Sequence, residues 1–371
     1  MDLLTTFPNY ATESPLSDNA EFPPSSDTEF YNSWNESWAS EPFYNSAQIH
    51  QVMKIVSMVI YSITLVLGAT GNGLVIFLTG FLMKKTVTTI WYLNLAVADF
   101  VFALSLSSEI AYLALDYHWT LGRLMCKLDS MVTFLNMFAS VFFLTAISAD
   151  RCVSVMFPVW ALNHRTLELA SLVAGCIWTA ALALSLPYLS FRDTKYLPDG
   201  SIWCIYNFGS EDDGGLRTQQ HFSVVMTEFT VGFVIPFTVI LACYCAIVIK
   251  LRRSLFSRSS RSVKIIVAVI QVFFCSWFPY HLFSILEILG EDSLGMQKTL
   301  DIGAPVAHGL FCLNSCLNPL LYTFVGTGCK AASGRSFLSS FKGAFSEKWV
   351  PHTLSRSRNS SSASAVESTM V

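Results

Sequence analysis

Hydrophobic residues gather along this chain in seven long stretches, with short polar segments between them. We place these stretches at residues 52–82, 89–115, 124–156, 167–190, 221–249, 263–289 and 301–325. A helix needs about 20 apolar residues to cross the hydrocarbon core of a bilayer, so each stretch is long enough. Prolines inside the last three stretches predict kinks, which membrane helices tolerate when neighbours satisfy the freed backbone groups. The pattern predicts an all-α integral membrane protein, a seven-transmembrane helix bundle.

The polar segments at the two ends of the chain differ in composition. The first 53 residues contain eight acidic residues and no lysine or arginine, which is typical of a solvated, disordered tail. We therefore divide the chain into an acidic extracellular N-terminus (1–50), a membrane domain (51–325) and a Ser-rich cytoplasmic tail (326–371). The tail begins with a Gly-rich segment, so the amphipathic helix expected there should be weak.

Charge in the connecting segments predicts the orientation in the membrane. Lysine and arginine are concentrated in alternate connections, for example at Lys84-Lys85 and over residues 250–264, whereas the other connections are richer in acids. The positive-inside rule places the basic set in the cytoplasm. We expect a multi-pass plasma-membrane protein with its N-terminus outside, where Asn35 in Asn35-Glu36-Ser37 is a glycosylation acceptor.

Two of the ten cysteines are set apart by this topology. Cys126 and Cys204 face the outside, whereas the other eight fall within spans or on the cytoplasmic side. An oxidising compartment favours a disulfide between them, joining the third span to the second outer loop; the alternative is two buried free thiols. In that loop, Pro198-Asp199-Gly200 lies between two short runs with β-forming residues. This predicts a small β-hairpin, held as a lid beside the opening of the bundle.

Polar side chains at membrane depth are costly to bury, so each suggests a function. Asp99 lies within the second span, and hydroxyl and amide side chains lie at similar depth in the third and seventh: Asn136, Ser140, Asn314, Ser315 and Asn318. A carboxylate among such oxygens can hold Na⁺ with water. The alternative is a structural hydrogen-bond cluster in which Asp99 is protonated, and the spacing favours neither.

Adjacent opposite charges, Asp150-Arg151, end the third span on the cytoplasmic side. Tyr244 and Tyr322 lie at the same depth in the fifth and seventh spans, where either phenol could meet Arg151 if the helices shift. Trp277 precedes the kink-forming Pro279, and its bulky ring could couple a ligand to an inner rearrangement. The alternative for Arg151 is an interfacial arginine that extends its charge to the headgroups.

Together these residues resemble the rhodopsin-like (class A) G-protein-coupled receptors. The motifs that carry the resemblance are Asn72, Leu95-Ala96-Val97-Ala98-Asp99, Asp150-Arg151-Cys152, Trp178, Pro236 with Tyr244, Trp277-Phe278-Pro279-Tyr280 and Asn318-Pro319-Leu320-Leu321-Tyr322. The resemblance implies that Asp150 restrains Arg151 at rest, and that Arg151 turns toward Tyr244 and Tyr322 as a Gα C-terminus enters. It also implies an allosteric Na⁺ pocket around Asp99, and no other cofactor.

Other stretches resemble the chemoattractant peptide branch of that family, the chemerin receptors more than the formyl-peptide receptors. They are Asp116-Tyr117-His118-Trp119, residues 136–144, residues 158–165 and Phe191-Arg192-Asp193-Thr194. The resemblance implies a peptide or small-protein ligand, a role in chemotaxis and coupling to Gi. It also implies phosphorylation of the tail by receptor kinases and recognition of the tail by arrestin. Membrane lipids surround the bundle, and no nucleic-acid partner is expected.

The expected ligand pocket is anionic. Glu228 stands in the fifth span where the related receptors carry an arginine that resembles an anchor for a peptide carboxylate. The pocket would comprise Glu109, Asp129, Glu228, Glu287, Asp301, His308 and Arg192. A cationic peptide end is favoured by Coulomb attraction, unless Arg192 or Lys195 supplies the countercharge.

A second departure concerns the sixth helix. Between Ser254 and Lys264 there is no acid that could hold Arg151, so we predict modest activity without ligand. In the tail, Cys329 stands where an aromatic residue is usual, which suggests palmitoylation.

Three other functions are kept open: an atypical receptor that internalises ligand without a G protein, a receptor for a lipid or small cationic ligand, and a transporter or channel. The intact Asp150-Arg151 and Tyr322 argue against the first. A transporter would need a continuous polar path and often has duplicated halves, neither of which is visible. We do not expect an enzyme, because P-loop, HExxH, GxSxG and CxxC motifs are absent from the sequence.

Overall fold

A computed structural model describes residues 28–208, 214–253, 260–289 and 294–327 of the chain. The chain divides into two units, Met1–Leu321 and Tyr322–Val371, and of the second only the end of the last helix is described. The Gly-rich segment with Cys329 and the Ser-rich tail lie outside the described residues.

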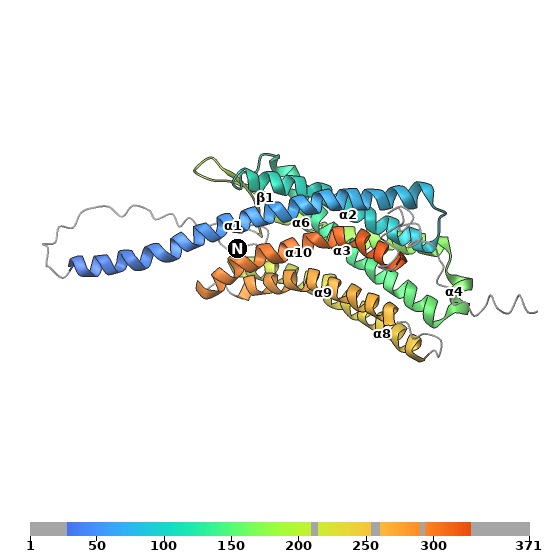
Figure 1. The fold of residues 1–371 in the computed structure, drawn as a ribbon. Coiled ribbons are helices and arrows are strands. Elements are labelled where there is room, and N and C mark those ends of the chain that lie inside the picture. Colours follow the sequence, from blue (N-terminus) through green and yellow to red (C-terminus); the bar gives the residue numbers. More distant parts are fainter. Residues whose placement is uncertain (1–27, 209–213, 254–259, 290–293, 328–371) are drawn as a thin grey trace, which may run out of the picture. The chain divides into compact units, whose positions relative to one another are not determined.

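Long helices run side by side through the first unit (Figure 1). They are α1 (Thr28–Phe77) with the π-helical turn η1 (Leu78–Leu82), α2 (Val87–Ala114), α3 (Gly122–Met156), α5 (Leu167–Ser185) with α6 (Tyr188–Phe191), α7 (Gly214–Thr227) with η2 (Glu228–Val234) and α8 (Ile235–Arg253), α9 (Ser260–Leu289) and α10 (Leu294–Thr327). Within the described part of the chain, seven helical segments are long and apolar enough to cross a membrane, which confirms the predicted seven-helix bundle.

The bundle has two distinguishable ends. The strands β1 (Arg192–Tyr196) and β2 (Ile202–Tyr206) lie at one end, which we call the hairpin end. The short helix α4 (Pro158–His164) lies at the opposite end, which we call the Arg151 end; Figure 1 shows the two at opposite ends of the helices. Pro158 occupies the first helical turn of α4, where its missing N–H costs nothing.

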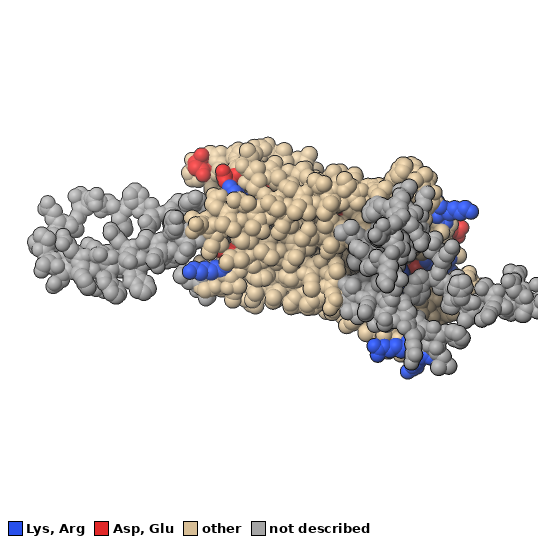
Figure 2. Space-filling model, in the orientation of Figure 1, with Lys and Arg blue, Asp and Glu red and all other residues tan. Residues whose placement is uncertain are grey.

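An apolar belt separates these ends. On the face shown in Figure 2, charged side chains gather at the two ends and leave the middle of the bundle without them. Large apolar side chains are exposed along the belt, among them Val59 at 52% and Leu172 at 66%. Such exposure is unfavourable in water and suits contact with lipid chains. Only 22% of the most apolar window of α1, and 22% of that of the fourth span, is buried in the bundle.

The first helix differs from the prediction of a span over 52–82. The helix begins at Thr28, and its apolar, membrane-length part begins at Ser46. A helix satisfies its own backbone hydrogen bonds, so it can continue into polar sequence that hydropathy alone assigns to a tail. Inside the bundle α1 packs closely on α2, where a Cβ added to Gly68 would lie 2.9 Å from that of Ala103.

The predicted hairpin is confirmed. Strands β1 and β2 pair antiparallel with Thr194 opposite Cys204. The turn between them needs Gly200, whose φ of 84° is accessible to glycine without strain. Leu197 N–H closes the turn by donating to the carbonyl of Ser201 at 2.9 Å.

Candidate functional site

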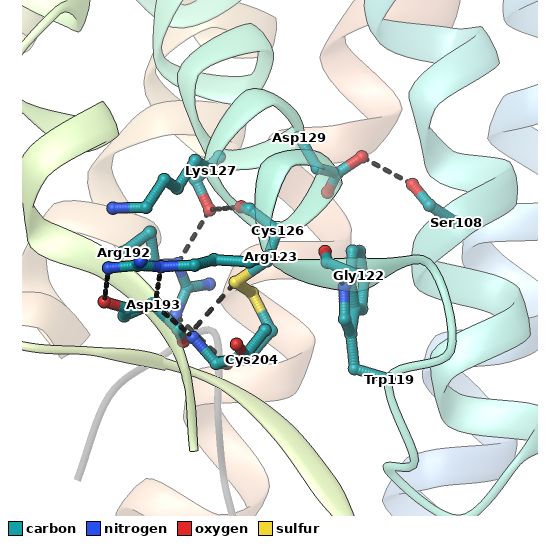
Figure 3. Close-up of a disulfide and its surroundings, with 12 residues drawn as sticks. Ser108, Trp119, Gly122, Arg123, Cys126, Lys127, Asp129, Arg192, Asp193 and Cys204 are labelled. Carbon is teal, nitrogen blue, oxygen red and sulfur yellow. Dashed lines mark hydrogen bonds and ion pairs between the residues drawn. A yellow bond between two sulfur atoms is a disulfide. The ribbon is translucent and has the colours of Figure 1, made fainter. Parts of the chain in front are cut away.

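The hairpin is fastened to the start of α3 by covalent and ionic links (Figure 3). Cys126 and Cys204 form the predicted disulfide. One turn earlier on α3, Arg123 donates two hydrogen bonds of 2.6 Å to the carboxylate of Asp193 on β1. From the segment before α3, the N–H of Trp119 donates to the carbonyl of Ile202 at 2.7 Å. A disulfide, an ion pair and a backbone hydrogen bond therefore hold the lid to the bundle.

Removing the charge of Arg123 should lower the thermal stability of the protein by an amount that depends on pH. The hydrogen bonds from Arg123 hold the pKa of the Asp193 carboxyl below its usual value. The stabilisation is therefore present above a carboxyl's ordinary pKa of about 4 and is lost as the pH falls through the lower folded value. We expect Arg123→Gln to lower the thermal midpoint of the purified protein at pH 7, and the difference from wild type to shrink below about pH 4. Thermal unfolding across this range checks it; a difference independent of pH would contradict the ion-pair explanation.

Arg192, the first residue of β1, points into the bundle rather than out of it. It is 2% exposed, its Nε donates to Ser130 Oγ at 2.7 Å, and its guanidinium lies 4.0 Å from the ring centroid of Tyr206. The charge interacts electrostatically with Glu109 and Asp129. The chain thus places one of its own cations against two of the predicted pocket acids.

The predicted pocket residues divide between two cavities. The first, of about 30 Å³, lies between α1, α2 and α10 and is lined by Glu109 and His308, with Lys54, Tyr61 and Tyr117 around them. Tyr61 and His308 Nδ1 are 2.6 Å apart, and His308 Nε2 has no hydrogen-bond partner. The other predicted acids near this cavity lie at its edges: Asp129 accepts a hydrogen bond from Ser108, and Asp301 is 3.7 Å from His50 Nε2.

The second cavity, also of about 30 Å³, contains Glu228 and Glu287 between the hairpin, η2 and α9. Its other walls include the aromatic rings of Phe134, Tyr206, Phe208 and Tyr280, together with His221, Val224, Val225 and Ser284. A volume of this size accommodates water rather than a peptide side chain, so the lining must move when a larger group enters.

Glu228 is buried at the start of a π-helical turn. It is the first residue of η2, in which Ile235 N–H donates to the carbonyl of Thr230, five residues earlier. Such π-turns are frequent at functional sites. Glu228 is 3% exposed, and its carboxylate accepts hydrogen bonds from Tyr188 Oη and, at 3.2 Å, from Tyr280 Oη.

Aromatic rings connect this cavity to the middle of the bundle. Tyr280 stacks on Phe311 with centroids 5.1 Å apart, and Phe311 contacts Trp277 edge-on at 5.3 Å. Trp277 is 1% exposed and its indole N–H has no hydrogen-bond partner. Pro279 lies two residues later inside α9, as predicted from the sequence. Because its indole N–H is unpaired, the Trp277 ring can move without breaking a side-chain hydrogen bond.

The predicted polar cluster assembles around Asp99. Ser140 Oγ and Asn318 Nδ2 donate to the two carboxylate oxygens, each at 2.8 Å. Ser140 also contacts the Asn136 amide at 3.0 Å, and Ser315 Oγ lies 3.3 Å from the same amide. Asn314 is buried beside them, and Asp99 itself is 0% exposed. Hydroxyl, amide and carboxylate oxygens of this kind fit a small hard cation, although the same contacts also satisfy a structural cluster.

At the Arg151 end the two adjacent charges interact electrostatically, but their hydrogen bonds go to other residues. Asp150 pairs with Arg165, which donates to its two oxygens at 2.8 and 2.9 Å and also to Thr88 Oγ1 at 2.7 Å. Arg151 instead donates to the hydroxyl of Tyr92 on α2. Neighbouring side chains on a helix diverge, whereas Arg165 follows α4 and approaches Asp150 from outside α3. Asp150 therefore has a charged partner that the motif alone does not reveal.

The remaining predicted residues are partly described. Tyr244 is buried in α8 and interacts electrostatically with Arg151. The side chains of Tyr322 and Asn35 lie outside the described residues. Residues that the sequence analysis missed are Tyr92, Arg165, Tyr188 and Tyr280. Only the position of Tyr280, one residue after Pro279, is a signal in the sequence, because the other three meet their partners through tertiary structure.

Comparison with known proteins gives consistent matches. Residues 71–322 match the family described as 7 transmembrane receptor (rhodopsin family). The chain is 44% identical over 291 residues to chemerin-like receptor 1 of Homo sapiens, covering 76% of this chain and 77% of that protein. It is 42% identical over 322 residues to chemerin-like receptor 1 of Sus scrofa (82% and 88%). It is 40% identical over 316 residues to formyl peptide receptor 2 of Mus musculus (83% and 90%).

Proposed function

The chain belongs to the rhodopsin family of seven-transmembrane receptors, and from this membership we propose that it is a receptor for a chemerin-like chemoattractant peptide or small protein. The ligand binds at the hairpin end, and the Arg151 end activates a heterotrimeric G protein of the Gi class. The observation that carries the proposal is the 44% identity to chemerin-like receptor 1 over 76% of the chain. Members of this receptor family are not enzymes, and the chain is a multi-pass membrane protein.

The geometry supports a path between the two ends. A ligand that enters the second cavity contacts Tyr280, and the ring contacts through Phe311 reach Trp277 beside the Pro279 kink. A shift of α9 about this kink opens the Arg151 end, where Arg151 leaves Tyr92 for Tyr244 and a Gα C-terminus enters. A ligand produces this change only to the extent that it binds the open arrangement better.

The orientation and the other partners belong to the same proposal. The hairpin end faces the outside, which places the Cys126–Cys204 disulfide in an oxidising compartment and makes Asn35 available for glycosylation. The Ser-rich tail faces the cytoplasm, where receptor kinases phosphorylate it and arrestin binds the added charge.

Expression in cells tests this proposal. Chemerin and peptides derived from it, including basic ones, are applied to cells that carry the receptor, and inhibition of cAMP synthesis is measured with and without pertussis toxin. We expect toxin-sensitive inhibition. Uptake of a labelled peptide without activation of any G protein would instead identify an atypical, internalising receptor.

We also propose that the Asp99 cluster holds Na⁺, with Ser140, Asn136, Asn314, Ser315 and Asn318 as neighbours. These residues join α2, α3 and α10, so an ion among them stabilises the resting arrangement and opposes agonist binding. In wild-type membranes, replacing N-methylglucamine chloride by NaCl should lower agonist affinity severalfold. Asp99→Asn keeps the shape and removes the charge, and should abolish this dependence. An equal sodium effect in both proteins would refute the site.

A further inference from the structure

The cavity that contains Glu228 indicates which side chain of the ligand it binds, an inference that rests on the proposed function. We propose that this cavity is the subsite for an arginine side chain of the ligand, with Glu228 as the carboxylate that pairs with its guanidinium.

The first support is that Glu228 has hydrogen-bond donors but no cation. Tyr188 and Tyr280 each donate to one of its oxygens. No ion pair joins Glu228 to a lysine or arginine of the described part of the chain. A buried carboxylate is costly unless a cation and hydrogen bonds compensate it, and two phenols supply only part of that compensation.

The second support is the number of acceptor positions that remain. Each carboxylate oxygen can accept two hydrogen bonds, so after the phenols each oxygen still has one free position. Two free positions on two oxygens match the two parallel N–H groups of a guanidinium. An ammonium group lacks this fork and is more strongly hydrated, so lysine fits less well.

The third support comes from the walls of the cavity. Phe134, Tyr206 and Tyr280 make the wall beside Glu228 aromatic, and Glu287 adds a second acid. The lining contains no lysine or arginine, and His221 is its one basic side chain. A planar guanidinium stacks on aromatic faces. The chain already shows this contact, because Arg192 lies 4.0 Å from the centroid of the Tyr206 ring. A peptide carboxylate would instead meet two acids.

Direct binding of a small probe tests the subsite without requiring G-protein activation. Thermal unfolding of the purified, full-length receptor is measured with millimolar N-acetyl-arginine methylamide and with its citrulline counterpart, which has nearly the same shape without the charge. We expect the arginine probe to raise the thermal midpoint more than the citrulline probe in wild type. This difference should disappear in Glu228→Gln and persist in Glu168→Gln, the same change at an exposed carboxylate in the first turn of α5.

Equal shifts by the two probes, or an arginine-specific shift that survives in Glu228→Gln, would overturn the proposal. The midpoints without probe show whether each variant folds. If Glu228→Gln does not fold, Glu228→Asp replaces it: the carboxylate is kept but is drawn back by one methylene group, so the arginine-specific shift should fall, and an undiminished shift would overturn the proposal.

Signalling then separates this proposal from the proposed function. Among chemerin-derived peptides that differ at one position, the arginine form should lose at least about tenfold in potency on Glu228→Gln, as for loss of a bidentate charged pair, whereas the citrulline form should not. Unchanged potency of the arginine forms would contradict the subsite while leaving the receptor function intact. Arginine-specific stabilisation without any peptide response would contradict the receptor function and leave the subsite intact.

Discussion

We expect Arg165→Ala to lower ligand-independent signalling about fivefold. Arg165 holds the Asp150 carboxylate with two hydrogen bonds, and their side chains are only 22% and 16% exposed. With Arg165 removed, Asp150 is left without this partner and interacts with Arg151, the next residue. On the proposed role of Asp150 as a restraint on Arg151, a gain of about 1 kcal/mol corresponds to about a fivefold change in the active population.

The measurement is basal Gi activity in cells at matched surface expression. Asp150→Asn supplies the control, because in that background Arg165→Ala has no carboxylate to release and should change nothing. Arg165→Lys keeps the charge and should fall between wild type and Arg165→Ala. Basal activity that rises in Arg165→Ala, or falls equally in both backgrounds, would show that Arg165 does not act through Asp150.

We expect Cys126→Ser and Cys204→Ser each to remove most high-affinity ligand binding. The disulfide joins residues 78 positions apart, and loss of a native disulfide costs about 2–5 kcal/mol in small secreted domains. In this chain the disulfide holds the lid in place. Cys204 lies opposite Thr194 in the hairpin, and Arg192 of the same hairpin contacts the bundle interior.

Saturation binding of a labelled chemerin-derived peptide, normalised to surface expression, checks this expectation. The double variant should match the single ones, because either substitution breaks the same bond. Cys176→Ser, which changes an exposed free cysteine of α5, should bind as wild type. A double variant with wild-type affinity would show that the remaining links, among them the Arg123–Asp193 pair, hold the lid without the disulfide.

The parts of the fold that follow from local sequence were predicted. The seven spans follow from runs of apolar residues, and the hairpin follows from Pro198-Asp199-Gly200 between β-forming runs. The disulfide follows from the predicted topology, in which Cys126 and Cys204 are the two cysteines assigned to the outward side. In each case the pattern that predicts the feature lies within one segment of the sequence or in the order of the segments.

The parts that depend on which segments meet in space were not predicted. Asp150 was assigned only to its sequence neighbour Arg151, whereas it also pairs with Arg165, which α4 brings back to α3. The phenols on Glu228 come from Tyr188 and Tyr280, 40 and 52 residues away. The π-turn η2 that begins at Glu228 has no recognised pattern in the sequence, and the polar start of α1 was assigned to a tail.

The placement of Arg192 has a consequence for how ligands can be assembled. Its guanidinium packs on Tyr206, a wall of the second cavity, while its charge faces Glu109 in the lining of the first. A ligand that reaches only one cavity leaves the contacts of the other unused. Two weakly binding fragments gain affinity when a linker of suitable length joins them. A linked pair of short peptides should therefore stay bound longer than either peptide alone.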